Sequence, residues 1–171
     1  VDVGSSLRDE DLGPAKQIIA AAKERGVPLH LPTDVIVAPS FDADDEAATV
    51  PLSQIGSRMI LDIGPATANT YAHVLRSART IVFNGPMGVY EKAAYQSGTK
   101  VVGEAIADAT RRGAVSVVGG GDAAAAAESL GFAAAVTHVS TGGGATLEFL
   151  EGKTLPGVAA LEAAAEQRTP R

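Results

Sequence analysis

Apolar residues recur along this chain in two patterns, short continuous runs and longer stretches with helical spacing. The short runs are rich in β-branched residues, which favours strands. The longer stretches repeat an apolar residue at the helical period, which favours helices with one buried face. Strands are predicted at 27–31, Asp34–Ala38, 58–62, Thr80–Phe83, 115–118 and 135–140. Helices are predicted at 11–25, 65–78, 99–112, 121–130, 145–151 and 158–166.

Strands and helices alternate along most of the chain, and the predicted strands are almost wholly apolar. Because the strands of a parallel sheet are buried on both faces, this pattern predicts an α/β fold. We expect a three-layer, Rossmann-like arrangement, with a mostly parallel sheet, helices on both faces and a small strand insertion at 34–51. The acidic segment 42–46 is predicted to be a solvated loop.

Glycine-rich loops follow three of the predicted strands and lead into helices. They read NGPMG after Phe83, GGGD after Val118 and TGGG after Ser140. Parallel strands bring their carboxyl ends to one edge of the sheet, where open α/β folds bind ligands. Glycine lets the backbone approach a ligand closely, and the free N–H groups of a helix's first turn attract anions. The sequence therefore predicts a phosphate-binding edge.

A carboxylate, Asp122, follows the glycines at the point where a phosphate would bind. It would repel a bare phosphate. A Mg²⁺ ion between the two removes the conflict, because Mg²⁺ typically takes one or two carboxylates together with substrate phosphates. The combination predicts a Mg-nucleotide. The alternative is that Asp122 only caps the helix, as Asp often does.

Two residues of the NGPMGVYE segment are further candidates. Glu91 is placed to accept hydrogen bonds from ribose hydroxyls, or it is simply an acid at the start of a helix. Asn84 is either part of the ligand edge or a turn residue.

Composition excludes several other classes of function. The formal charge of the 171 residues is −6, which argues against a nucleic-acid surface with its clustered Lys and Arg. The absence of cysteine excludes disulfides and thiolate metal sites, and fits a reducing cytosol. The longest apolar runs are too short for a membrane span. We expect no nucleic-acid or membrane partner.

Known nucleotide motifs fit poorly. Gly119, Gly121 and Ala124 match G-x-G-x-x-A, but the ribose-binding acid expected about 20 residues later is missing. The P-loop pattern G-x-x-x-x-G-K-[ST] does not occur. A dinucleotide-binding oxidoreductase domain is therefore the weaker alternative.

Long segments of the chain resemble phosphoglycerate kinase, in the order of that family. They are LPTDVIVA (31–38), LDIGPAT (61–67), VFNGPMGVYE (82–91), SVVGGGDAAAA (116–126) and HVSTGGGATLEFLEGKTLPGVAAL (138–161). The resemblance implies that 1–161 is a partial C-terminal, nucleotide-binding domain and 162–171 a tail. It also implies a cytoplasmic, monomeric parent enzyme of glycolysis, which transfers a phosphoryl group reversibly between 1,3-bisphosphoglycerate and ADP, giving 3-phosphoglycerate and ATP.

The resemblance implies a role for each loop. Asp122 would act on the Mg²⁺ of bound ADP or ATP, Glu91 would hold the ribose, and Leu61 would lie near the adenine. The residues touching the phosphates or lining the nucleotide pocket would be Asn84, Gly85, Met87, Gly120, Gly121 and the backbone of Ala123. The residues stabilising the transferring phosphoryl group would be Gly121, Gly142, Gly143 and Gly144.

The chain departs from the family pattern in several places. Ala123 stands where the family usually has Thr or Ser, and Phe83 stands where Trp is common. The family's N-terminal domain, which binds 3-phosphoglycerate or 1,3-bisphosphoglycerate, and a glycine- and lysine-containing nucleotide loop are missing. We therefore expect the isolated chain to have negligible kinase activity, marginal stability and a tendency to associate. The alternative function is a non-catalytic Mg-nucleotide-binding module.

Overall fold

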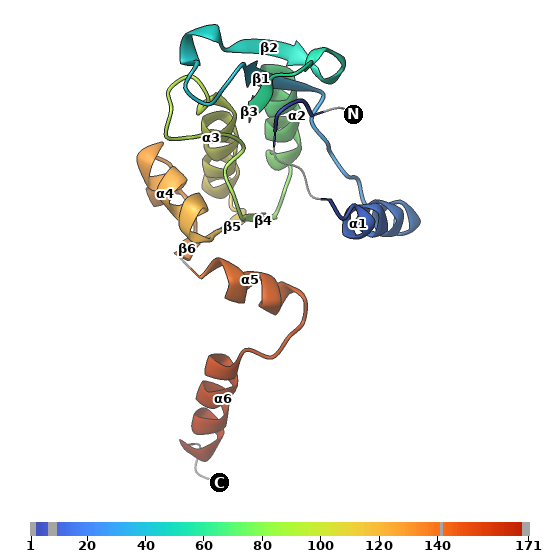
Figure 1. Ribbon diagram of the computed structural model, residues 1–171. Coiled ribbons are helices and arrows are strands. Elements are labelled where there is room, and N and C mark those ends of the chain that lie inside the picture. Colours follow the sequence, from blue (N-terminus) through green and yellow to red (C-terminus); the bar gives the residue numbers. More distant parts are fainter. Residues whose placement is uncertain (1–2, 7–9, 141, 169–171) are drawn as a thin grey trace.

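The computed structural model describes residues 3–6, 10–140 and 142–168 (Figure 1). Within them, one sheet is parallel and has the order β4-β5-β6. It consists of β4 (Thr80–Phe83), β5 (Val115–Gly119) and β6 (His138–Ser140). Each of these strands precedes one of the predicted glycine loops. The predicted α/β class is confirmed.

A second sheet is antiparallel and has the order β2-β1-β3. It consists of β1 (Asp34–Ala38), β2 (Ala48–Pro51) and β3 (Met59–Ile63). The predicted strand insertion is therefore larger than residues 34–51, because β3 pairs with β1 and not with the parallel strands. An apolar run shows that a strand is buried, but it does not show which partner the strand takes.

Three helices cover one face of the parallel sheet: α2 (Pro65–Leu75), α3 (Ser97–Arg111) and α4 (Gly121–Ser129) (Figure 1). Inward-facing residues of β4 and β5 pack with them into one apolar core. At its centre the rings of Phe83 and Phe132 meet edge to face, with centroids 6.0 Å apart. The opposite face of the sheet carries exposed side chains, including Val82 and Val115.

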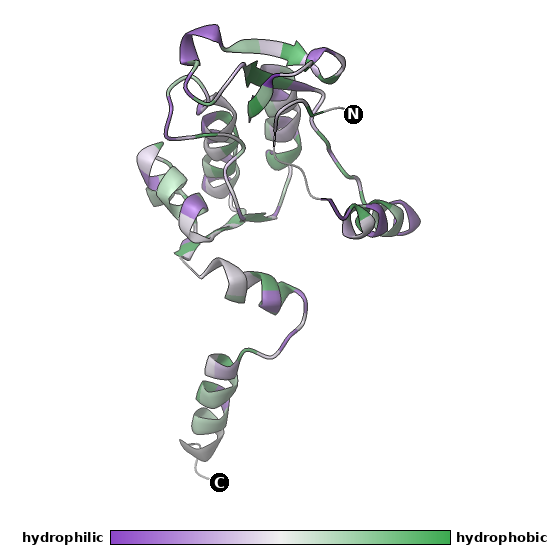
Figure 2. Cartoon of the chain, in the orientation of Figure 1, coloured by the Kyte–Doolittle hydropathy of each residue, from purple (hydrophilic) through white to green (hydrophobic). Residues whose placement is uncertain are grey.

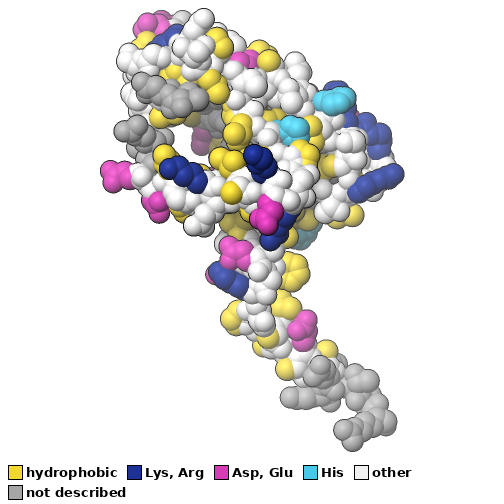
Figure 3. Space-filling view, turned by 90° about the vertical axis from the view of Figure 1, so that its right-hand side faces the viewer, with side chains coloured by type: hydrophobic (Ala, Val, Ile, Leu, Met, Phe, Trp, Pro, Cys, Tyr) yellow, Lys and Arg dark blue, Asp and Glu magenta, His cyan; other side chains and the backbone are white. Residues whose placement is uncertain are grey.

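Three further helices stand away from this body in Figure 1: α1 (Gly13–Glu24), α5 (Gly143–Leu150) and α6 (Pro156–Arg168). The residues of α1 and α5 are exposed or half-buried. These helices contain hydrophobic residues, green along the ribbon in Figure 2, whose side chains are exposed; Phe149 is 63% exposed. Figure 3 shows hydrophobic side chains, in yellow, at the surface. Such uncovered apolar surface favours association with another surface.

Some predicted bounds were wrong. Residues 27–31 form no strand, and Val27, Leu29 and Leu31 are exposed, because no described strand lies beside them. β6 begins at His138, after a 3₁₀ turn at Ala133–Ala135, so it is shorter than predicted. α5 begins at Gly143, within the glycines, and α6 continues past the predicted end at residue 166. Residues 169–171 of the predicted tail lie outside the described part.

The start of α2 is fixed by a side chain from another element. Pro65 opens the helix, and the carboxylate of Asp34 on β1 accepts hydrogen bonds from Ala66 N (3.0 Å), Thr67 N (2.7 Å) and Thr67 Oγ1 (2.6 Å). Burial acts to raise the pKa of Asp34, but these hydrogen bonds outweigh it and lower that pKa. Asp34 therefore caps α2 and ties the two sheet regions together.

Candidate functional site

The three glycine loops converge at one edge of the parallel sheet, as predicted. Gly120 N donates a hydrogen bond to Ser140 O at 2.9 Å, which joins the second loop to the end of β6, where the third loop begins. The side chain of Asn84 reaches both: a Cβ on Gly119 would lie 3.4 Å from its Oδ1, and one on Gly143 3.8 Å from it. Asn84 therefore lies between the second and third loops, and the reading of Asn84 as a turn residue was wrong.

The second and third loops touch backbone to backbone. A Cβ on Gly143 would lie 2.8 Å from Cα of Gly120, closer than real Cβ contacts allow. Gly120 itself has φ +104°, which L side chains rarely adopt. By contrast, no described atom lies within 4 Å of a Cβ built on Gly85, Gly121 or Gly144. The packing of the fold therefore requires only some of these glycines.

The first turn of α4 carries the predicted acid. Gly120 is the N-cap residue, and among the described residues no side chain caps this helix. Asp122 is exposed in the first turn and Ala123 behind it is buried. The reading of Asp122 as the cap is therefore wrong. Its carboxylate and the first-turn N–H groups remain available to a ligand at the edge.

The third loop leads into α5, whose N-cap is Gly142. Gly142 N donates to Ser140 Oγ at 3.2 Å, and Thr146 Oγ1 donates to Gly142 O at 2.9 Å. Thr141 lies outside the described residues. Gly142, Gly143 and Gly144 thus surround the start of a second helix at the same edge, as predicted.

Glu91 lies in a turn, so the predicted helix start at this position was wrong. Its neighbour Tyr90 connects it to α4. Burial, the charges of Glu91 and Asp122, and a hydrogen bond to Glu91 raise the pKa of Tyr90. Both carboxylates therefore act on one hydroxyl, although they belong to different loops. Sequence reasoning missed Tyr90, and its position next to Glu91 was the only available signal.

Leu61 on β3 contacts the loop that connects β4 to α3, and Met87 belongs to this loop. Leu61 is buried with Ala38 and Tyr95, and it meets the loop through its carbonyl, which accepts from Val89 N at 2.9 Å. Met87 N donates to Thr99 Oγ1 at 2.9 Å. Met87 also borders an apolar hollow of about 270 Å³ beside the edge strand β4, away from the glycines.

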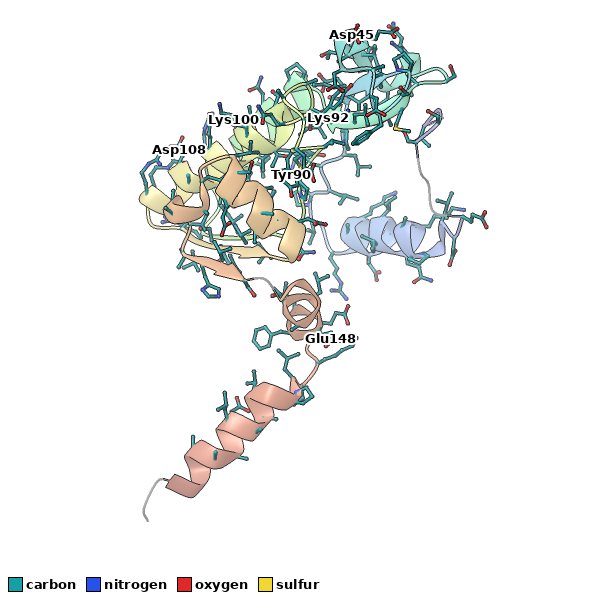
Figure 4. All side chains as sticks on the ribbon, turned by 60° about the vertical axis from the view of Figure 1, so that its left-hand side comes forward. Asp45, Tyr90, Lys92, Lys100, Asp108 and Glu148 are labelled. Carbon is teal, nitrogen blue, oxygen red and sulfur yellow. The ribbon has the colours of Figure 1, made fainter. Side chains whose placement is uncertain are left out.

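Lys92 anchors the same connecting loop to the acidic segment. Its Nζ lies 3.2 Å from Asp42 Oδ1 and 3.0 Å from Asp44 Oδ1, and 4.2 Å above the ring of Phe41. In Figure 4 Lys92 lies toward the antiparallel sheet, and Tyr90 lies closer to α4. The acidic segment, predicted to be a solvated loop, is therefore partly neutralised by Lys92.

Asp62 is a further residue that sequence reasoning missed. It is 1% exposed at the end of β3. Its Oδ2 accepts from Gly98 N at 2.7 Å, and its Oδ1 accepts from Ile63 N at 2.8 Å. Burial raises its pKa to about 6, against the lowering effect of these two N–H groups.

The described residues offer little for a closed metal site. Among them no group of three or more His, Asp or Glu side chains could hold a metal ion. The exposed carboxylate of Asp122 fits a site that takes most of its oxygens from a ligand, as Mg²⁺ sites on nucleotides do. None of the described helices is long and apolar enough to cross a membrane.

Comparisons with known proteins agree on one family. The family model for phosphoglycerate kinase matches residues 1–153. The phosphoglycerate kinase of Prosthecochloris aestuarii is 53% identical over 93% of this chain and 41% of its own length. That of Chlorobaculum tepidum is 52% identical over 94% of this chain and 41% of its own length.

Solved structures give the same result. Phosphoglycerate kinase from Coxiella burnetii has a TM-score of 0.84 and 41% identity, over 92% of this chain and 41% of that one. The enzyme from Pyrococcus horikoshii has a TM-score of 0.70 and 33% identity, over 97% of this chain and 42% of that one. The predicted Rossmann-like class is confirmed by these neighbours. This chain spans about two fifths of the relatives it matches, and it belongs to the phosphoglycerate kinase family.

Proposed function

We infer that this chain is the nucleotide-binding part of a cytoplasmic, monomeric phosphoglycerate kinase. The whole enzyme would transfer a phosphoryl group reversibly between 1,3-bisphosphoglycerate and ADP, giving 3-phosphoglycerate and ATP in glycolysis. Residues 1–161 would form part of its C-terminal domain. The observation that carries this proposal is the convergence of three glycine loops and Asp122 at one sheet edge.

The chemistry of the edge suits a Mg-nucleotide. Phosphate oxygens would accept hydrogen bonds from the first-turn N–H groups of α4, at Gly121 and Ala123, in the positive end of the helix dipole. Asp122 would contribute a carboxylate oxygen to the nucleotide's Mg²⁺, which supplies positive charge to the phosphates. Asn84, Gly85 and Met87 would form the wall of the nucleotide pocket.

The remaining groups have distinct tasks. Glu91, next to Tyr90, would accept hydrogen bonds from the ribose. The start of α5 at Gly142, Gly143 and Gly144 would stabilise negative charge on the transferring phosphoryl group, because its N–H groups are fixed before the reaction. We keep Leu61 as a residue near the adenine, on the side where its carbonyl holds the connecting loop.

Turnover would need more than this chain. Phosphoryl transfer depends on positioning both substrates and on neutralising charge in flight. The acceptor site for 3-phosphoglycerate would lie in the N-terminal domain of the longer relatives. The isolated chain should therefore bind nucleotide and show negligible kinase activity in a coupled assay.

Thermal unfolding with ADP and Mg²⁺ tests the proposal. A ligand that binds only the folded state stabilises it, by about 2.7 kcal/mol at a concentration 100 times Kd, and therefore raises the midpoint temperature. We expect a rise with ADP plus Mg²⁺, a smaller one with ADP plus EDTA, and none with NAD. Asp122→Asn should reduce the Mg²⁺-dependent part of the rise.

Glu128→Gln is the matched control, because Glu128 is an exposed acid on the last turn of the same helix. It should leave the ADP response unchanged. A rise with NAD alone would overturn the kinase proposal in favour of a dinucleotide-binding domain. Near-normal turnover by the isolated chain would refute the requirement for a second domain.

A further inference from the structure

A buried carboxylate lies under the loop that carries several of the proposed nucleotide contacts. This loop, residues 84–96, connects β4 to α3 and is called the connecting loop below. Asp62 belongs to neither element, since it is the next-to-last residue of the antiparallel strand β3. Its carboxylate takes no part in the proposed nucleotide contacts, so its burial needs another explanation.

The connecting loop and the first turn of α3 both close over this carboxylate. A Cβ on Gly88 would lie 2.5 Å from Asp62 Oδ1, and a Cβ on Gly98 would collide with the same atom. Gly98 N, in the first turn of α3, donates to Asp62 Oδ2. The N-cap residue Gln96 makes no side-chain capping bond, and Asp62 caps α3 from β3 instead, as Asp34 caps α2 from β1.

Two further hydrogen bonds, one next to Asp62 and one next to Gly98, attach the connecting loop. Val89 N donates to Leu61 O, one residue before Asp62, and Met87 N donates to the buried Thr99 Oγ1, one residue after Gly98. The loop is therefore held at Met87, Val89 and Gly98 around a single carboxylate. Asn84, Met87 and Glu91 depend on this path of the loop for their positions.

We propose that Asp62 is a positioning residue for nucleotide binding, which fixes the connecting loop by capping α3 and by filling the space beneath Gly88. This inference rests on the proposed function, because the loop matters for activity only if it binds nucleotide. Asp62 acts through the loop and touches no ligand itself.

The charged groups around Asp62 are engaged elsewhere or point away from it. Asp34 on β1 caps α2, Lys92 in the loop pairs with Asp42 and Asp44, and Lys100 on α3 is exposed. Burial and two backbone N–H groups account for the raised pKa of Asp62. Opening of the loop would hydrate the carboxylate and return its pKa toward 3.8.

Thermodynamic linkage gives the direction in which opening of the connecting loop depends on pH. The closed loop holds the proton more tightly than the open loop, so falling pH favours the closed loop. With pKa values of about 6 closed and 3.8 open, opening should be about tenfold less favourable at pH 5 than at pH 7. A side chain that merely fills space would show no such dependence.

Hydrogen exchange of the ligand-free chain tests the proposal. In Asp62→Asn, amides of 84–98 should exchange about tenfold faster than in the wild type, because the amide group cannot accept both N–H bonds. The tenfold pH effect on their protection should disappear. Asp34→Asn is the matched control, and it should instead loosen residues 65–68.

Equal protection of 84–98 in the wild type and Asp62→Asn, or a pH effect that survives the substitution, would overturn the proposal. If Asp62→Asn does not fold, Gly88→Ala tests the same contact from the loop side and should also speed exchange at 84–98. ADP affinity is measured in parallel with Mg²⁺. A wild type that binds no ADP refutes the proposed function, while exchange still decides the role of Asp62.

Discussion

Alanine substitutions at two glycines should separate what the fold requires from what the ligand requires. Gly121 opens α4, and no described atom lies within 4 Å of a Cβ built on it. Gly143 opens α5, and its Cβ would lie 2.8 Å from Gly120 Cα and 3.3 Å from Gly120 N. Each glycine begins a helix at the same edge, but only Gly143 faces another backbone.

The two changes should therefore have opposite effects on the free protein. Gly121→Ala removes conformational freedom from the unfolded chain without a clash, which stabilises by about 0.4–1 kcal/mol. Gly143→Ala forces two backbone segments apart, which costs about 1–3 kcal/mol. For a chain of this size, 1 kcal/mol corresponds to about 2–4 °C in Tm. Gly121→Ala should raise Tm by about 1–4 °C, and Gly143→Ala should lower it by about 2–12 °C.

When nucleotide is present, Gly121→Ala should be less stable than the wild type instead of more stable. Under the proposed function, the Cβ of Gly121→Ala would occupy space that the phosphates approach. A tenfold weaker Kd would remove about 1.4 kcal/mol of the stabilisation by ligand. Thermal unfolding with and without ADP plus Mg²⁺ measures both quantities on the same samples. Gly121→Ala should combine a normal or raised Tm with a reduced response to ADP.

Gly157→Ala provides the control, because Gly157 lies in the first turn of α6 with the same open surroundings and away from the site. It should raise Tm slightly and leave the ADP response intact. A full ADP response in Gly121→Ala would refute phosphate binding at the start of α4. An unchanged Tm in Gly143→Ala would refute the tight contact between the second and third loops.

Two further predictions concern the buried and capping carboxylates. Because burial raises the pKa of Asp62 to about 6, its contribution to the free energy of unfolding should fall by about 2 kcal/mol as pH rises from 4 to 6. Urea denaturation of wild type and Asp62→Asn should show this in their difference, and a difference of opposite slope would contradict it. Asp34→Asn should lose about 1 kcal/mol at pH 7 through the cap of α2. Because the pKa of Asp34 is lowered in the folded state, this loss should shrink in acid, and equal stability of the two proteins at pH 7 would count against the cap.

Local chemistry made much of the architecture predictable. Helix ends at Pro65, Gly113 and Gly131 follow from the backbone preferences of proline and glycine, which are independent of distant contacts. The common edge of the three glycine loops followed from the parallel order of their strands. These features need no knowledge of partners far along the chain.

The remaining features of the fold and the site depended on tertiary contacts that the sequence does not reveal. The run at 27–31 has strand-like residues, but it lies beside no described strand and stays irregular. β3 was placed with the parallel strands, yet it pairs with β1. Asp62 gave no local signal, because its role comes from Gly98 in α3. Tyr90 gave only its position next to Glu91, because the effect of Asp122 on it comes from another element.

The order in which the site can form follows from the contact of Gly120 with Gly143. Each parallel pair joins distant residues, with Thr80 beside Val115 and Val117 beside His138. Pairings of such sequence separation form slowly, since a long segment must close first. During synthesis, α4 leaves the ribosome before β6 and α5, so its glycine turn has to wait for the backbone that packs against it. Under the proposed function, the nucleotide edge would therefore form only after β6 and α5 are in place, and nucleotide binding would report that this edge has folded.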